Sequence, residues 1–218
     1  MAKRNERVVY GIPCIDRHDY EDKEIAAKIN EYRARSVKSF TEFLTNVPGS
    51  EKFKTFLDVG PGDTADMDLF RKTNPNYENV HGIDLYLDDS DYTEDLIKGD
   101  WYEMANENLL AIPEGESVNA MYINHSLEHA ANIYALMEQV SRLQNKGDAL
   151  FIAVPEGNSE FGYAITSSTT HFSVITKGFL ATTLQRFGYQ VQVEDKEFRE
   201  GAPELWSHAI KQYDGFGE

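Results

Sequence analysis

The feature that most constrains the fold is an alternation between short apolar segments and segments with helical spacing, which begins near residue 54. The short apolar segments, bounded by turn residues, predict seven strands at 54–60, 79–85, 96–100, 117–124, 148–154, 189–197 and 204–213. Apolar residues at helical spacing predict intervening helices at 64–72, 127–143 and 176–187. Strands that alternate with helices pair mostly in parallel. The sequence therefore predicts a doubly wound, mostly parallel α/β sheet with helices on both faces.

A longer helix is expected ahead of the sheet. Apolar side chains recur at helical spacing from Ile25 through Tyr32 to Phe43, which predicts a helix over about 19–46, ended by a Pro-Gly pair. The residues before it mix charged and turn types. We therefore expect a helical N-terminal extension with a cap helix at 1–50 and one sheet domain at 51–218.

The charge balance limits the partners. Acidic residues outnumber basic ones by 37 to 21, which gives a formal net charge of −16. Proteins bind nucleic acids by neutralising phosphates with Lys and Arg, so this balance argues against DNA or RNA and suits a small neutral or cationic ligand. No apolar stretch could span a membrane and no secretory signal is visible, so we expect a cytoplasmic protein. The single cysteine, Cys14, excludes an internal disulfide and a cysteine-based zinc cluster.

The first predicted strand runs into a glycine turn, DVGPG at 58–62. In doubly wound sheets, ligands bind beyond the carboxyl ends of the strands, and glycines let the backbone approach them closely. The turn fits the G-x-G-x-x-[GA] pattern of dinucleotide sites, with Asp84 at the spacing of the ribose-binding carboxylate. An ordinary strand-to-helix turn is the alternative. Asp58 would face a pyrophosphate unfavourably, and it suits a cationic ligand without phosphate, such as S-adenosylmethionine.

Two further carboxylates follow predicted strands. Asp84 ends the second strand and could accept two hydrogen bonds from a ribose diol, which are strong when the acceptor is charged. A turn or helix cap is the alternative role for such a residue. Asp100 follows the weak third strand and could accept from an adenine amino group, with Trp101 or Tyr102 against the ring. The alternative for Asp100 is a solvated loop acid.

Five motifs, LDVGPGD, HGIDL, KGDWYEM, INHSLEHA and ALFIAVP, follow one another over about residues 54–155. In this order they resemble class I S-adenosylmethionine-dependent methyltransferases, in particular the small-domain group often called type 11. The resemblance implies a Rossmann-like methyltransferase fold with an antiparallel seventh strand, here at SHAIKQY. It also implies S-adenosyl-L-methionine as cofactor and S-adenosyl-L-homocysteine as product. The implied cofactor-binding residues are Asp58, Gly60, Pro61, Gly62, Asp84, Leu85, Asp100, Trp101, Asn124 and His125.

One residue departs from the pattern of that family. Thr64 stands where a third glycine is common. This departure keeps a second function open, namely a non-catalytic S-adenosylmethionine-binding or partner-activating subunit. An NAD-dependent oxidoreductase is a third alternative, which Asp58 and the lack of a separate substrate domain disfavour.

The segment HSLEH at 125–129 matches the H-x-x-E-H signature of one class of zinc proteases. That signature needs both histidines on one helix face and a third ligand downstream. Here the segment directly follows a predicted buried strand, so we expect no metal site. Glu128 and His129 are instead candidates for a general base or a substrate contact, with a helix-opening acid and a packed histidine as the alternative. His171, which follows the long loop after the fifth strand, is a further candidate base.

The methyl acceptor is not readable from the sequence. A D-P-P-Y-type string, expected of amino-methylating DNA enzymes, is absent, and no Pro-Cys nucleophile follows the fourth strand. Together with the acidic charge, this leaves a small molecule as the first expectation and a protein as the second. The oligomeric state is open, a homodimer included.

Overall fold

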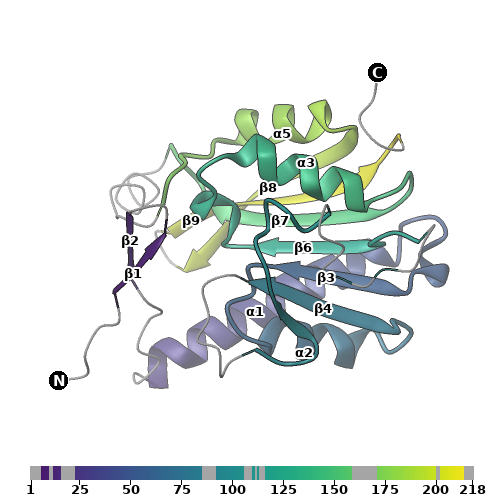
Figure 1. Ribbon diagram of the computed structural model, residues 1–218, viewed down its shortest axis with the longest axis horizontal. Coiled ribbons are helices and arrows are strands. Elements are labelled where there is room, and N and C mark those ends of the chain that lie inside the picture. The colour runs from purple at the N-terminus through teal and green to yellow at the C-terminus, as the bar shows by residue number, and fades with distance from the viewer. Residues whose placement is uncertain are drawn as a thin grey trace.

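The computed structural model describes residues 6–9, 12–15, 23–84, 92–105, 110, 112, 116–158, 171–199 and 202–213 (Figure 1). Its main feature is a seven-stranded sheet with the strand order β5-β4-β3-β6-β7-β9-β8. The strands are β3 (Thr55–Val59), β4 (Asn79–Asp84), β5 (Leu96–Lys98), β6 (Ala120–Asn124), β7 (Ala149–Pro155), β8 (Tyr189–Arg199) and β9 (Ala202–Lys211). Strands β3 to β7 pair in parallel, and β9 is antiparallel to both β7 and β8. This order confirms the predicted doubly wound sheet and its antiparallel seventh strand.

Helices cover both faces of the sheet (Figure 1). They are α1 (Lys23–Leu44) and α2 (Ala65–Thr73) on one face, and α3 (Ile133–Leu143) and α5 (Lys177–Arg186) on the other. Short 3-10 turns occur at η1 (Ser50–Lys52) and η2 (Leu127–His129). None of these helices, among the residues that the structure describes, is both long and apolar enough to cross a membrane.

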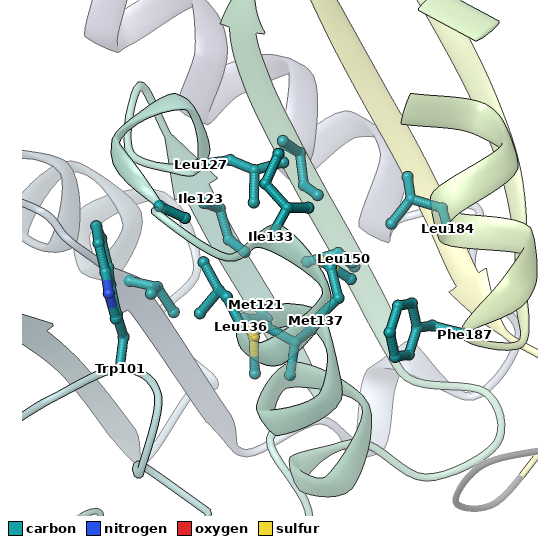
Figure 2. Close-up of a cluster of buried hydrophobic side chains, with 14 of the residues drawn as sticks. Trp101, Met121, Ile123, Leu127, Ile133, Leu136, Met137, Leu150, Leu184 and Phe187 are labelled. Carbon is teal, nitrogen blue, oxygen red and sulfur yellow. The ribbon is translucent and has the colours of Figure 1, made fainter. Parts of the chain in front are cut away.

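Each face has its own apolar core. On the α3 side, Leu136 and Met137 point from the helix towards Met121, Ile123 and Leu150 of the sheet (Figure 2). On the α1 side, the core is largely aromatic: the Phe56 and Phe70 rings stack with centroids 3.8 Å apart, and Tyr122 stacks on Phe151 at 5.0 Å. Helix α1 is part of this second core through Phe40, whose ring lies 5.6 Å from that of Phe151. The division of the chain at residue 50 stays a prediction.

A conservative truncation measures how firmly α1 is held. Val37 is 2% exposed in the core, whereas the side chain of its neighbour Lys38 is 75% exposed. We expect Val37→Ala to lower the free energy of unfolding by about 2 kcal/mol, because two buried methyl groups are removed. Lys38→Ala should change it by less than about 0.5 kcal/mol. Urea denaturation of both variants makes the comparison, and equal effects would mean that α1 does not belong to the core.

Two features differ from the sequence-based expectation. The predicted helix at 127–143 is wrong at its start: residues 127–129 form the turn η2, and α3 begins only at Ile133. The Asn132 side chain accepts a hydrogen bond from the Ala135 amide, so it caps the helix and separates it from the turn. The second feature is an unpredicted hairpin of β1 (Glu6–Val9) and β2 (Ile12–Ile15).

The last helix, α5, begins and ends close to where the sequence predicts. The Thr176 side chain accepts from the Phe179 amide at the start of α5. Gly188 follows the helix with φ 82°, a left-handed conformation that glycine adopts without strain. These local signals confirm the predicted position of α5.

Candidate active site

The site lies where the order of the strands reverses. The chain passes from β3 outward to β4 and β5, and then returns to the other side of β3 with β6 and β7. The carboxyl ends of β3 and β6 therefore diverge into connections on opposite faces of the sheet, which is where doubly wound folds bind their ligands. The predicted residues after β3, β4 and β6 meet at this edge.

The glycine turn after β3 is closely packed. Gly60 and Gly62 both have φ 72°, which a residue with a side chain rarely adopts. A Cβ atom on Gly60 would lie 2.7 Å from Ser126 Oγ and 2.9 Å from an atom of the Trp101 ring. The Ser126 hydroxyl also donates a hydrogen bond of 2.9 Å to the Gly60 carbonyl. Position 60 must therefore be glycine for the loops after β3, β5 and β6 to meet.

The Thr64 departure does not strain the turn. Thr64 has φ −88° and ψ −2°, a conformation open to any residue. Asp63 Oδ1 accepts from the Ala65 amide at 2.9 Å and so supports the start of α2. No glycine is needed at this position for the backbone to turn into the helix.

Asp84 is linked to the glycine turn. Its side chain is buried at the end of β4, and Oδ2 accepts a hydrogen bond of 3.1 Å from the Gly62 amide. The carboxylate therefore lies beside the turn, as a ribose-binding role requires. Leu85, the predicted neighbour of the adenine, lies outside the described residues.

Asp100 and Trp101 lie next to one another but differ in their surroundings. Asp100 Oδ1 accepts from the Tyr102 amide at 2.8 Å, which is the local turn contact expected of an aspartate after a strand. Trp101 is 8% exposed and stands at the edge of the α3-side core, apart from its centre (Figure 2). Because its ring also abuts Gly60, Trp101 connects that core with the glycine turn.

A cluster of acids surrounds Asp58. Asp58 is 1% exposed, and its Oδ2 atom makes no hydrogen bond with any described residue. Burial raises the pKa of the Asp58 carboxyl well above its usual range, and the charge of Asp66 raises it further, against the lowering effect of Arg33. The Arg33 guanidinium forms two ion pairs: Nη2 lies 3.1 Å from Asp63 Oδ2, and Nε lies 3.7 Å from Asp66 Oδ1. The Arg33 side chain is 14% exposed, so it belongs to this acid cluster and not to a solvated helix face.

Asn124 is held by two neighbours. The Tyr32 hydroxyl donates a hydrogen bond of 2.8 Å to Asn124 Oδ1, and Asn124 Nδ2 donates one of 3.2 Å to Asp66 Oδ2. These bonds connect α1, β6 and α2 at the edge where β3 and β6 end. Asp66 was not predicted, because nothing local in the sequence distinguishes it from other helix-opening acids.

His125 is enclosed by carboxylates. Its backbone has φ 54°, its Nε2 lies 2.5 Å from Glu204 Oε1, and its Nδ1 lies 3.3 Å from Glu128 Oε1. Burial alone would lower the pKa of His125, but the charges and hydrogen bonds of Glu204 and Glu128 outweigh it and raise the pKa to about 10. His125 is thus a cation at neutral pH. Glu204 also accepts from Trp206 Nε1 at 2.8 Å, and the sequence analysis did not single it out.

The three candidate catalytic residues come together. The rings of His129 and His171 are perpendicular, with centroids 4.5 Å apart, and Glu128 lies beside both. The Phe172 amide donates a hydrogen bond of 2.9 Å to the Glu128 carbonyl, and this bond holds the segment that carries His171 against the turn η2. Burial lowers the pKa of His171 to about 4; Glu128 opposes this shift, and His129 and His125 add to it. His171 is therefore neutral at neutral pH.

Comparisons with solved structures agree with the fold. A S-adenosylmethionine-dependent methyltransferase from Archaeoglobus fulgidus is 16% identical, with a TM-score of 0.63 over 82% of this chain and 94% of that chain. The Haloferax volcanii complex of the Trm112 methyltransferase activator and a methyltransferase matches with 15% identity and a TM-score of 0.62, over 91% of this chain and 100% of that chain. The magnesium protoporphyrin IX methyltransferase ChlM from Synechocystis PCC 6803, with bound S-adenosylhomocysteine, matches with 12% identity and a TM-score of 0.56, over 91% and 90%.

The sequence comparison identifies the family. None of the curated proteins matches this sequence significantly. The family model described as a methyltransferase domain matches residues 29–194, which is more than half of the chain. The match begins within α1 and ends within β8, so it includes every residue of the candidate site except Glu204. Together with the strand order, it confirms the predicted class I methyltransferase, and the chain belongs to the methyltransferase-domain family.

Proposed function

We propose that the protein transfers the methyl group of S-adenosylmethionine to a small-molecule acceptor bound at the carboxyl edge of the sheet. The observation that carries this proposal is the convergence of Asp58, the glycine turn, Asp84 and Asn124 at the reversal of strand order. S-adenosylmethionine supplies an activated methyl on a sulfonium, so the protein mainly has to position donor and acceptor.

The charges around the turn suit a cationic ligand. Asp58, Asp63, Asp66 and Asp84 gather there, and Arg33 is the cation that pairs with two of them. The buried Oδ2 of Asp58 makes no hydrogen bond with the described residues and could accept from an ammonium group. A pyrophosphate would be repelled by the same carboxylates, which disfavours a dinucleotide.

Two groups could accept a proton from the acceptor. His171, with a pKa lowered to about 4, is unprotonated at neutral pH, and His129 lies against it. His125 cannot act in this way near neutral pH, because its pKa of about 10 keeps it protonated. We infer that Glu128, His129 and His171 form the acceptor side of the site, with the proton passing to an imidazole as the methyl is transferred. A small acceptor fits the net charge of −16 better than a nucleic acid, and a protein acceptor ranks second.

Calorimetric titration tests the cofactor. The protein should bind S-adenosylmethionine and S-adenosylhomocysteine but not NADH. Asp84→Ala should weaken binding by about 10- to 100-fold, because hydrogen bonds to a charged acceptor are worth about 1.5–3 kcal/mol. The matched control is Asp195→Ala, since Asp195 is an exposed strand carboxylate that pairs with Lys177 far from the turn in sequence.

The other outcomes separate the alternatives. Binding of NADH alone would assign the turn to a dinucleotide and contradict the proposal. Cofactor binding without methyl transfer to any acceptor would favour the non-catalytic subunit. Equal weakening in Asp84→Ala and Asp195→Ala would mean that Asp84 does not contact the cofactor.

A further inference from the structure

Three side chains with metal-binding atoms converge beside the proposed acceptor site. One oxygen of Glu128 and one ring nitrogen each of His129 and His171 all lie within 4.8 Å of one another. Bonds of Zn²⁺ to nitrogen and oxygen measure about 2.0–2.2 Å, so two ligands of one ion lie at most about 4.4 Å apart. His129 and His171 are partly exposed, and a small rotation of either ring would close the difference.

The carboxylate of this triad is buried with unused hydrogen-bonding capacity. Glu128 is 2% exposed, and apart from the close approach of His125 neither of its side-chain oxygens has a hydrogen-bond partner among the described residues. His125 Nδ1 lies 3.3 Å from Oε1, which is close enough for an ion pair. A buried carboxylate normally has several partners, since an unsatisfied one costs free energy. A cation at the side of Glu128 that faces the two histidines would supply the missing partner.

Neighbouring residues hold Glu128 and His171 in position, as is usual for metal ligands. His125 fixes Glu128 from one side and is itself held by Glu204, so the carboxylate has a second layer of support. The backbone carbonyl of Glu128 receives the Phe172 amide, which keeps His171 close.

We propose that Glu128, His129 and His171 bind a divalent first-row transition metal ion, with Zn²⁺ as the best-fitting ion. Two imidazoles and one carboxylate are a known zinc ligand set that leaves one or more positions open. An acceptor hydroxyl would take an open position, where the ion would lower its pKa so that its proton passes to water and not to an imidazole that holds the ion. Its oxygen would then bond to the methyl carbon as the carbon–sulfur bond breaks and S-adenosylhomocysteine leaves. This use of the ion, which makes the acceptor a hydroxyl compound, rests on the proposed function; the binding of the ion does not.

The geometry also differs from that of the helical H-x-x-E-H signature. His125 lies in a left-handed conformation before the turn η2, and its ring nitrogens face Glu204 and Glu128. The second nitrogen ligand is therefore His171, which lies far along the chain, and not the first histidine of the motif. The expectation of no metal, drawn from the sequence, considered the motif without His171.

Metal titration of the full chain is the direct test. Chelator-treated protein is titrated with Zn²⁺ in competition with a chromophoric chelator, and separately with Co²⁺, whose visible absorption reports nitrogen and oxygen ligands. One equivalent of Zn²⁺ should bind. His129→Ala and His171→Ala should each weaken binding by more than about 100-fold, because loss of second-layer partners alone costs about 10- to 100-fold. His81→Ala is the matched control, since His81 lies on β4 away from the triad, and should bind as the wild type does.

The outcomes are decisive in both directions. Equal Zn²⁺ affinity in the wild type and both histidine variants would overturn the site, as would no stoichiometric binding by folded wild type. Glu128→Gln serves if either histidine variant unfolds, and it should also weaken binding. Titration of the same samples with S-adenosylmethionine keeps the two proposals apart. Cofactor binding without metal overturns only the metal site, and metal binding without cofactor overturns only the proposed function.

Discussion

Gly60→Val should abolish measurable binding of S-adenosylmethionine while the protein still folds. Two costs add at this position. The backbone has φ 72°, which a β-branched residue adopts only with strain, and the new side chain would meet Ser126 and Trp101 at under 3.0 Å. Both neighbours must move, and they carry the loops after β6 and β5. We expect an affinity loss of more than about 1,000-fold, or about 4 kcal/mol, by calorimetric titration.

A second glycine separates strain from steric overlap. Gly147 has φ 97°, and a Cβ atom there would have nothing within 4 Å. Gly147→Val should therefore lower the free energy of unfolding by about 1–2 kcal/mol, as left-handed strain does, and leave cofactor affinity unchanged. If both variants lost affinity to the same degree, the loss would come from general destabilisation, and the packing argument for Gly60 would fail.

Glu204→Ala should destabilise the protein by about 3–5 kcal/mol. Glu204 is fully buried, accepts from Trp206 Nε1, and lies 2.5 Å from His125 Nε2. Removing one partner of a buried ion pair leaves the other charge uncompensated, and the remaining pair of His125 and Glu128 only partly offsets this. Chemical denaturation measures the loss. Glu197→Ala, on the neighbouring strand β8, is the control and should cost less than about 0.5 kcal/mol.

The same interaction predicts a pH dependence. His125 has a pKa of about 10 in the folded protein, above the usual value near 6.5 in an unfolded chain. Its contribution to stability is therefore complete below about pH 6.5 and is lost as the pH rises towards 10. In chelator-treated protein, the unfolding free energy of the wild type should fall over this range. In Glu204→Ala the fall should be smaller, and an identical pH profile would show that Glu204 does not hold the proton on His125.

The strands and the glycine turn could be predicted because their signals are local. Apolar alternation marks β3, β4, β6 and β7, and the glycines stand directly after β3. The start of α3 was also readable, since Asn132 is a good cap before Ile133. The prediction from apolar spacing instead extended the helix back to residue 127.

Pairings between distant segments could not be predicted. Arg33 looks like any helix-surface cation in the sequence, and only the fold places it against Asp63 and Asp66. Glu204 is likewise an ordinary residue of its own strand, and His171, although a candidate base, carries no signal in the sequence that pairs it with Glu128 and His129. Their contacts with His125 and Glu128 depend on how β9 and the segment before α5 return to the end of β6. The spacing of apolar residues, every two residues in strands and every 3.6 in helices, gives no information about contacts between such distant segments.

The position of β9 affects how the chain folds while it is being synthesised. β9 follows every other described element in sequence, yet in the sheet it lies between β7 and β8. All residues of β7 are buried in the folded protein, and β9 covers one of its edges. On the ribosome, that apolar edge therefore stays open until the chain has been made past Ala202. Unpaired edges of this kind invite pairing with other chains, so we expect a chain cut short before β9 to aggregate and to be inactive.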